Sequence, residues 1–328
     1  MFLDSRAASK KNVNPAFLAF KTASRGGFFY AIFEQKPYNS TTSLLASIFN
    51  SMEILRLLQQ NLPPFAVDIV RLCIWLVLLV ILFVPLERVF ARHPQKIFRK
   101  GFLTDLGYYF ISSLIPAHVL VVPMAALAWG LHYFVPGGLH QWVAGQPLGM
   151  RLAASLVVGE FGFYWGHRWM HEIPLLWRFH AIHHSAEQID WLVNTRAHPV
   201  DMVFMRLCGF VPLYIVGLAQ PMGNGKMDML PLLVILIGTA WGFFIHANLG
   251  WRFGWLEWLI STPAFHHWHH TNDGPALINK NYASMVPWVD KLFGTLYLPK
   301  QWPAKYGIDG PMAPGLVGQL IQPFDYRQ

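Results

Sequence analysis

The sequence predicts an all-α fold: a polytopic integral membrane helical bundle of about four to five spans with a cytoplasmic, histidine-rich helical cap. Three observations predict it. Of the 328 residues, 54% are hydrophobic and only 13% are charged, whereas a soluble domain usually has roughly 25% charged residues. Long apolar runs recur along the chain, and the mean hydropathy is +0.34. Most histidines gather at the ends of these runs or just beyond them.

Five apolar runs have about the length that a helix needs to cross a bilayer. They cover residues 69–86, 105–135, 152–170, 200–219 and 229–248. Pro116 and Pro123 lie inside the second run, which is therefore expected to be bent or to form two shorter helices. The fourth run is joined to the fifth by a short turn, typical of a helical hairpin, that contains Pro221, Gly223 and Gly225.

The distribution of basic residues predicts which loops face the cytoplasm. An excess of Lys and Arg marks cytoplasmic loops, and the loop at 87–100 contains Arg88, Arg92, Lys96, Arg99 and Lys100. The loop at 136–149 has neither Lys nor Arg and is expected on the opposite side. The segments after the third and fifth runs then return to the cytoplasm. We expect a bacterial inner membrane or the endoplasmic reticulum as the location.

The chain divides into three predicted parts. Residues 1–65 form an N-terminal arm that is disordered, bound at the membrane surface or a targeting segment. An over-long gene model is a further alternative, because Met52 begins a more regular stretch. Residues 66–300 form the membrane domain, and residues 301–328 form a C-terminal tail.

Charge and cysteine content exclude several classes of site. The formal net charge is +8, but the basic residues form no long tract, so no nucleic-acid partner is expected. Anionic lipid headgroups account for the charge more simply. The two cysteines, Cys73 and Cys208, both lie in apolar runs and cannot build a disulfide framework or a thiolate metal site. Any metal must therefore bind nitrogen and oxygen ligands.

Histidines are concentrated in one part of the chain, where eleven of the fifteen fall between positions 167 and 270. Three groups have helical spacing, so that their rings share one face of a helix. Two single histidines, one in the stretch RAHPVD and one at the end of the fifth run, join them. The groups are His167 with His171, His180 with His183 and His184, and His266 with His269 and His270; the single residues are His198 and His246. Pro174 is expected to stop or kink the helix that carries the first group.

A metal centre explains these groups better than packing does. Burying several unpartnered imidazoles would cost a few kcal/mol each, and protonated rings would repel one another. A bound cation removes both problems, and imidazole suits iron, zinc, copper and nickel. Eight to ten imidazoles exceed the need of one metal, so two metals are predicted. Carboxylates are candidates to hold the outer ring nitrogens: Glu172, Glu187, Asp190 and Asp273. His267 faces away from His266 and His270, so it either supports the ligands or fills space.

The segments HRWMH, HAIHH and PAFHHWHH resemble the HxxxH, HxxHH and HxxHH boxes of the fatty acid hydroxylase/sterol desaturase superfamily, a group of integral membrane non-haem diiron enzymes. The resemblance extends to Arg196–Pro199, to His246 with Asn248, and to residues 281–295, where Ala283 replaces a glycine that is common in the family. It implies two iron ions. The implied ligands are His167, His171, His180, His183, His184, His266, His269 and His270, with His246 as a ninth and His198 as a tenth. Asn248 is implied to hold a metal-bound water.

The resemblance also implies an activity and partners. The expected reaction uses O2 and two electrons to hydroxylate or desaturate an unactivated C–H bond of a membrane lipid, such as a sterol, a fatty acyl chain or a sphingolipid. The chain has neither a GxGxxG dinucleotide fingerprint nor the HPGG haem motif. A separate electron donor of the ferredoxin or cytochrome b5 type is therefore expected. Five tryptophans near the boxes either line a substrate tunnel or form an interfacial belt: Trp165, Trp169, Trp177, Trp191 and Trp268.

Three alternatives to this reading remain open. A pterin-dependent enzyme of the alkylglycerol monooxygenase type shares the same boxes. A membrane metal-binding or transport protein would also use histidines, but it predicts polar residues inside the spans. A haem-binding redox protein would leave most of the imidazoles without a role. The sequence does not indicate an oligomeric state.

Overall fold

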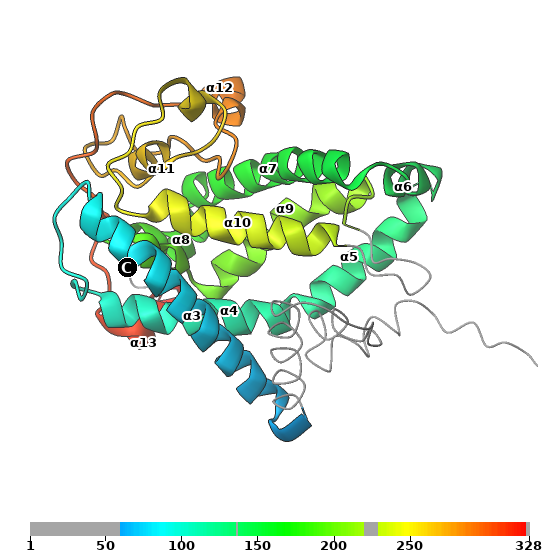
Figure 1. The fold of residues 1–328 in the computed structure, drawn as a ribbon, viewed down its shortest axis with the longest axis horizontal. Coiled ribbons are helices and arrows are strands. Elements are labelled where there is room, and N and C mark those ends of the chain that lie inside the picture. Colours follow the sequence, from blue (N-terminus) through cyan, green and yellow to red (C-terminus); the bar gives the residue numbers. More distant parts are fainter. Residues whose placement is uncertain (1–59, 136, 220–228, 326–328) are drawn as a thin grey trace, which may run out of the picture.

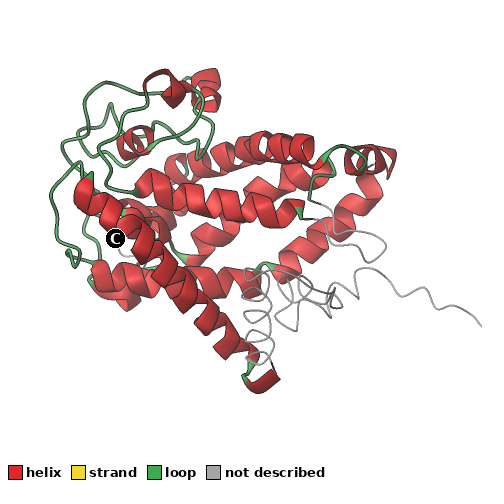
Figure 2. Ribbon diagram, viewed as in Figure 1, coloured by secondary structure: helices red, strands yellow, loops and turns green. Residues whose placement is uncertain are grey.

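The part of the chain that this computed structural model describes, residues 60–135, 137–219 and 229–325, consists of helices joined by loops and contains no β-strand (Figures 1 and 2). Two isolated β-bridges pair Ala91 with Leu249 and Thr271 with Tyr306. The longer helices are α3 (Pro64–Val89), α4 (Phe102–Val119), α5 (Val121–Phe134), α6 (Gly137–Ala144), α7 (Leu148–Glu172), α8 (Pro174–His184), α9 (Pro199–Ile215) and α10 (Leu230–His246). The shorter ones are η2 (Trp191–Thr195), η4 (Gly254–Trp258), α11 (Pro263–His269), α12 (Trp288–Phe293), α13 (Gly315–Ile321) and η5 (Gln322–Phe324).

The apolar runs of the sequence correspond to these helices. The second run forms two helices, α4 and α5, which meet at Leu120, as the two prolines predicted. The expected hairpin turn at 220–228 and most of the arm at 1–65 lie outside the described residues. Within the described ranges, α3 is the one helix long and apolar enough to cross a membrane, and α10 is apolar but has 17 residues. The all-α class is thus confirmed, whereas the number of spans and the cytoplasmic cap stay predictions.

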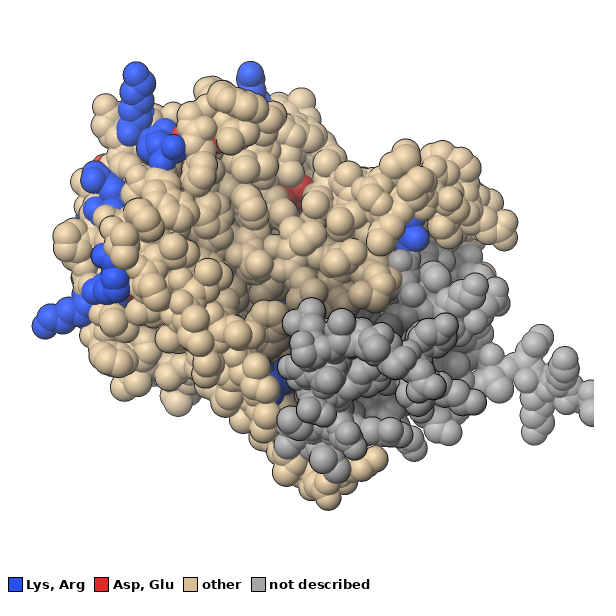
Figure 3. All heavy atoms as spheres, viewed as in Figure 1, with Lys and Arg blue, Asp and Glu red and all other residues tan. Residues whose placement is uncertain are grey.

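The histidine-rich segments meet at one end of the molecule. The C-terminal ends of α3, α7 and α10 lie at the left of Figure 1, where α8 and α11 also lie. Most of the Lys and Arg side chains visible in Figure 3 are at this same end. The chain turns from α7 into α8 at Ile173, which has an extended conformation, and Pro174 then occupies the first turn of α8. The predicted interruption at Pro174 is therefore confirmed.

Small residues let α7 and α9 pack with their backbones close together. A side chain on Gly162 would overlap the backbone carbonyl of Cys208. A Cβ on Gly166, one turn later, would lie 2.7 Å from the Cys208 Cβ. Glycines four residues apart form the kind of surface on which a second helix can pack closely. This contact fixes α7, which carries the first histidine pair, against α9.

Replacing Gly162 with alanine should therefore destabilise the helix pair by about 1–3 kcal/mol or more, because backbone cannot move aside as a flexible side chain can. Gly149 is the matched control, since it lies in the same helix and a Cβ there would meet no atom within 4 Å. The thermal unfolding temperature of each variant in detergent measures the effect. Gly149→Ala should unfold at or above the temperature of the parent protein. Equal temperatures for the two variants would contradict the packing argument.

Two clusters of buried side chains support the histidine-bearing end. One joins α3, α4, η2 and α10 through residues such as Phe83, Trp191 and Phe243. The other joins α7, α11 and α12 through Tyr164, Phe265 and other buried residues. The rings of Phe83 and Trp191 stack with their centroids 6.1 Å apart. The histidines thus project from helices that are held in place by packing on both sides.

Candidate metal centre

Four helices supply the histidines of the site. His167 and His171 lie one turn apart at the end of α7, and His246 is the last residue of α10. The short helix α8 carries the second box, and α11 carries most of the third. Helix α11 begins where Thr262 accepts a hydrogen bond from the backbone N–H of Phe265, and Pro263 follows in its first turn. Of the nine rings described next, eight are buried and His171 is half-buried.

The nine rings form two groups. Group A contains His167, His171, His180, His184 and His269, and group B contains His183, His246, His266 and His270. In each group, one ring nitrogen from every residue lies within 4.8 Å of the others. The second and third boxes are each divided between the groups. Residues at i and i+4 stay together, whereas His183 and His269, at i+3, belong to the other group.

The two groups adjoin each other. The rings of His184 and His270 stack across the boundary with centroids 4.4 Å apart. Four further ring pairs cross it with centroids 5.1–5.4 Å apart: His180–His183, His183–His184, His266–His269 and His269–His270. Two ions, one in each group, would therefore be neighbours.

The outer nitrogens of several rings are fixed by backbone carbonyls. The Nδ1 atoms of His167, His183, His246 and His269 lie 2.7–3.0 Å from the carbonyl oxygens of Tyr282, Arg196, Gly242 and Lys280, respectively. A carbonyl oxygen can only accept a hydrogen bond, so each of these Nδ1 atoms carries the ring proton and donates the hydrogen bond. The neutral ring then has its lone pair on Nε2, which is the arrangement found in metal-bound histidines.

Where a carbonyl fixes the proton on Nδ1, as in His183 and His246, the inner nitrogens face one another without a proton between them. In group B, the Nε2 atom of His246 lies 3.0 Å from that of His266, 3.2 Å from that of His270 and 3.2 Å from that of His183. In group A, the buried Nε2 atoms of three residues have no partner within the described part of the chain: His171, His184 and His269. Lone pairs that face each other are unfavourable unless a cation lies between them. The residues present therefore fit a metal ion in each group.

Burial keeps these imidazoles neutral. It lowers the pKa of His180 and of His183 to about 3, and in His183 the neighbouring His180 adds to the effect. Burial likewise lowers the pKa of His266, His269 and His270 well below the ordinary value. At neutral pH all five rings are uncharged, so their lone pairs are available to a metal.

Asp201 is a functional residue that the sequence interpretation missed. Its Oδ2 atom lies 2.9 Å from Nδ1 of His180, and its side chain is buried at the start of α9. A carboxylate on the outer nitrogen holds a ligand ring in one orientation and makes it a stronger base. The signal was present in the stretch RAHPVD, because an ionisable residue at the start of an apolar run is unusual.

We predict that Asp201→Asn lowers the metal affinity of group A by about 10- to 100-fold, the usual effect of losing such an outer partner. Glu172→Gln is the control. Glu172 is also an acidic residue next to a box, but its side chain is 41% exposed and pairs with Arg168. Titration with a chelator of known affinity, read as metal bound per chain, compares the two variants. Equal affinities would remove Asp201 from the site.

The four carboxylates predicted to hold ring nitrogens have other partners. Glu187 forms an exposed ion pair with Lys100, and Asp190 pairs with the buried Arg99. Asp273 accepts hydrogen bonds from the backbone N–H groups of Ala304 and Lys305, and Glu172 pairs with Arg168 as described above. The carbonyl groups and Asp201 take the expected role, so this prediction was wrong.

Two further predicted site residues, His198 and Asn248, have structural roles, as Asp273 does. His198 lies outside both groups, because its Nδ1 accepts from the N–H of Val200 at the start of α9 and its Nε2 is 3.2 Å from the carbonyl oxygen of Leu320. The side-chain amide of Asn248 accepts a hydrogen bond from the backbone N–H of His93 and donates one to the His93 carbonyl oxygen. Asp273 holds the loop at Ala304 and Lys305 by accepting hydrogen bonds from their backbone N–H groups. The structure therefore does not bring these residues to the histidine groups.

His267 supports the centre from outside. It is fully buried, its Nδ1 lies 2.9 Å from the Tyr306 hydroxyl, and its Nε2 lies 3.2 Å from the carbonyl oxygen of Ala247, the residue after His246. Of the five tryptophans, Trp177 contacts rings of group A, with centroids 5.2 Å from His171 and 5.6 Å from His184. Trp191 packs in the core instead.

Two buried carboxylates hold the loop that orients the first box. Asp290 accepts hydrogen bonds from the N–H groups of Tyr282 and Ala283, and Glu160 accepts from Ser284 and Met285. The same loop provides the Tyr282 carbonyl that binds His167. The resemblance of residues 281–295 to a family segment indicated this region without giving its role. The loop fixes the orientation of a ligand ring.

Comparison with known proteins agrees with this geometry. The family model described as "Fatty acid hydroxylase" matches residues 152–295, which include all nine histidines. The chain is 36% identical to ornithine lipid hydroxylase OlsE of Rhizobium tropici over 224 residues, 66% of this chain and 61% of that protein. It is 29% identical to human alkylglycerol monooxygenase over 160 residues, 47% of this chain and 32% of that protein. It is 27% identical to methylsterol monooxygenase 2-2 of Arabidopsis thaliana over 201 residues, 59% of this chain and 67% of that protein.

The chain thus spans less than two thirds of the length of the ornithine lipid hydroxylase and about a third of that of the alkylglycerol monooxygenases. No solved structure matches it. The histidine boxes predicted the same family that the comparison finds, and the matched segment contains both groups. The stretch that carries both histidine groups thus matches the fatty acid hydroxylase family, and the chain is similar to lipid hydroxylases and monooxygenases.

Proposed function

We propose that this protein is an O2-dependent oxidoreductase that binds two iron ions, one in each histidine group, and hydroxylates or desaturates an unactivated C–H bond of a membrane lipid. One observation carries the proposal. Two adjoining groups of buried, neutral imidazoles present unprotonated nitrogens to a common centre. Iron is the metal that combines imidazole ligation with the redox change that this reaction needs. Bound iron would supply the activation of O2.

The protein's own residues bind, orient and shield the centre. Nε2 atoms bind the ions, while the backbone carbonyls and Asp201 hold the outer nitrogens so that the rings cannot turn. Burial excludes water, which protects a strongly oxidising centre from side reactions. Trp177 lies against group A and is the tryptophan best placed to contact a substrate there.

The names of the relatives support a lipid as the substrate. They act, by name, on an ornithine lipid, an alkylglycerol and a methylsterol. These molecules share a long apolar part and differ in their polar part. The same names describe hydroxylases and monooxygenases, which favours hydroxylation over desaturation for this chain.

The apolar helix α3 supports a location in a membrane, with the histidine groups at the cytoplasmic face. The basic residues at the same end of the molecule favour that orientation (Figure 3). We further propose that a separate ferredoxin or cytochrome b5-type protein delivers the two electrons.

Lipid analysis tests the proposed function. Extracts of the host with the gene intact, deleted, or carrying His183→Ala are compared by mass spectrometry. Hydroxylation predicts that the last two lack a lipid heavier than its precursor by one oxygen atom, and desaturation predicts the loss of a lipid lighter by two hydrogens. Unchanged lipids in the deletion strain, with the gene shown to be expressed, would contradict the proposal.

A pterin-dependent reaction is the second candidate, because three alkylglycerol monooxygenases match the chain at 29–31% identity. Purified protein supplied with a tetrahydropterin, or with a reduced ferredoxin, distinguishes the two sources of electrons. Turnover with the pterin alone would favour this candidate.

A further inference from the structure

Two hollows lie on either side of a pair of aromatic rings where the chain passes from α3 to α4. The ring centroids of Phe98 and Phe102 are 5.0 Å apart in an edge-to-face arrangement. One hollow, of about 430 Å³, is lined by both rings together with Leu103 and Thr104. The other, of about 210 Å³, is lined by both rings and by residues of α3 and of the 190–192 segment. Neither hollow includes a histidine of the two groups.

The surroundings of the hollows are apolar and exposed. Phe98 is 76% exposed and Leu103 is 79% exposed. Val80 and Val84 line the smaller hollow from α3, whose exposed side continues along Val77 and Ile81 toward the other end of the helix. Exposed apolar side chains on this scale mark a surface that meets lipid or another apolar partner. Because α3 is the helix suited to cross a membrane, the apolar surface that leads into the hollow would lie along lipid in the proposed membrane location.

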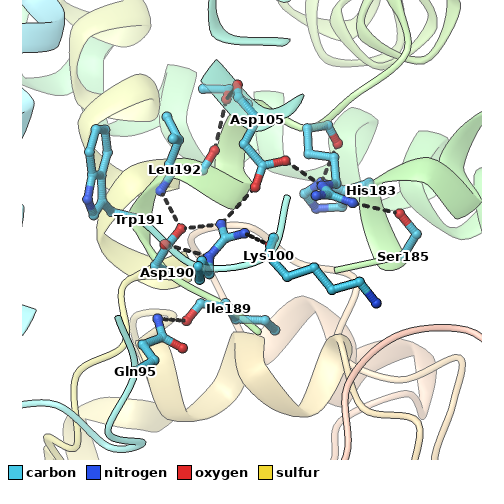
Figure 4. Close-up of polar contacts among 12 residues, drawn as sticks. Gln95, Lys100, Asp105, His183, Ser185, Ile189, Asp190, Trp191 and Leu192 are labelled. Carbon is cyan, nitrogen blue, oxygen red and sulfur yellow. Dashed lines mark hydrogen bonds and ion pairs between the residues drawn. The ribbon is translucent and has the colours of Figure 1, made fainter. Parts of the chain in front are cut away.

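The acidic groups near the smaller hollow are already satisfied. Glu87 is buried and accepts hydrogen bonds from the N–H groups of Trp191 and Asn248. Asp190 is held by both arms of the Arg99 guanidinium (Figure 4). The Asp190 carboxylate therefore offers no free negative charge to a ligand.

Two basic residues at the rim retain free donors. Arg88 is exposed and donates one hydrogen bond, 2.6 Å long, to the carbonyl oxygen of Gln95. The Gln95 side chain in turn donates a hydrogen bond to the carbonyl oxygen of Ile189. These two hydrogen bonds hold the edge of the hollow in place. Lys96 is exposed, and within the described ranges it has no hydrogen-bond or ion-pair partner. Nearby Lys100 is paired with Glu187. The edge of the smaller hollow thus carries two positively charged side chains, Arg88 and Lys96, next to the apolar lining formed by Val80 and Val84.

We propose that this smaller hollow binds an anionic phospholipid, with the headgroup phosphate between Arg88 and Lys96 and an acyl chain along Val80 and Val84. Cations above an apolar surface match a phosphodiester joined to hydrocarbon. Free phosphate could bind the two basic side chains but would make no use of the apolar lining at Val80 and Val84. An acidic protein would make no use of an apolar surface that continues along a membrane helix. The site is separate from the histidine groups and does not depend on their activity.

Lipid binding to the full-length protein tests the site. The protein in an uncharged detergent is titrated with phosphatidylglycerol or with phosphatidylcholine, and bound lipid per chain is counted by native mass spectrometry. Phosphatidylglycerol should bind about 5- to 30-fold more tightly, the effect of one to two cations near a lipid phosphate. Arg88→Gln/Lys96→Gln should lose that preference. Phe98→Ala should weaken the binding of both lipids.

Controls separate this site from general attraction to the basic end. Lys291→Gln/Lys300→Gln removes the same charge from exposed lysines elsewhere and should keep the preference. Equal losses in both double variants would overturn the proposal, as would displacement of the lipid by millimolar inorganic phosphate. If the Arg88 variant fails to fold, Lys96→Gln alone should still reduce the preference, because Lys96 has no structural partner among the described residues. Bound metal should stay unchanged in every variant, so failure here is distinguishable from failure of the proposed function.

Discussion

Replacing His183 with alanine is expected to reduce the metal content from two ions to one per chain and to lower turnover by more than about 100-fold. Loss of an outer partner alone costs up to about 100-fold, and His183 supplies an inner nitrogen. Its Nε2 lies 3.2 Å from that of His246, and its Nδ1 is fixed by the Arg196 carbonyl. Group A keeps all five of its residues in this variant. Elemental analysis of purified protein, with turnover measured on the same sample, checks both expectations.

His198→Ala is the matched control, because the sequence pattern alone also marks His198 as a ligand. Its ring caps α9 and lies outside both groups. Losing a cap costs about 1 kcal/mol of stability, so this variant should unfold slightly earlier and keep two metal ions. If His198→Ala lost metal and His183→Ala kept it, the division into groups A and B would be wrong.

Eight of the nine grouped histidines could be picked out in the sequence because helical spacing is a local property. Residues at i and i+4 share a face wherever a helix forms, so HRWMH and HAIHH indicate convergent rings without knowledge of the tertiary fold. The division of each box between two groups could not be predicted. It depends on how α8 and α11 cross the ends of α7 and α10, which is a matter of packing between segments far apart in the chain.

The outer partners of the rings were harder to predict for a similar reason. Tyr282, Lys280 and Arg196 bind ligand rings through backbone carbonyls, and a carbonyl belongs to every residue, so residue type gives no signal. The acidic residues near the boxes in sequence were poor guides, since Glu172 and Glu187 face outward toward basic side chains. Asp201 reaches His180 from α9, twenty-one residues further along the chain.

At the level of the fold, hydropathy located the helices, but not how they pack. The prolines of the second run predicted a bend or two shorter helices, and the run forms the two helices α4 and α5. The close approach of α7 to α9 depends on Gly162 and Gly166. In the sequence, a glycine inside a helix indicates a loss of helix stability and does not indicate a contact with another helix. Local sequence patterns therefore predicted the helices, whereas the contacts between the helices could be seen only in the structure.

The largest effect on stability is expected at Arg99, which pairs with Asp105 and Asp190 in a buried network of charges. Figure 4 shows these two carboxylates in the same region as His183 of group B. The Arg99 guanidinium binds Asp190 through two hydrogen bonds and also pairs with Asp105, which in turn binds Arg196. The side chains of Arg99 and Asp105 are at most 1% exposed. Removing one partner of a buried pair leaves an uncompensated charge and costs about 3–5 kcal/mol. We expect Arg99→Met to destabilise the protein by this amount.

The neighbouring residue provides the comparison that identifies burial as the cause. Lys100 pairs with Glu187 in the same two segments of the chain, but these side chains are 83% and 67% exposed. An exposed pair contributes about 0–1 kcal/mol, so Lys100→Met should barely change the unfolding temperature. Adding Asp190→Leu to Arg99→Met should recover part of the lost stability, because the second change removes the carboxylate that the first leaves unpaired. Equal effects at Arg99 and Lys100, or a double variant less stable than either single one, would show that the network does not act as a buried charge pair. Since the backbone of Arg196 also holds His183, loss of metal from group B alongside the loss of stability would link this network to the metal centre.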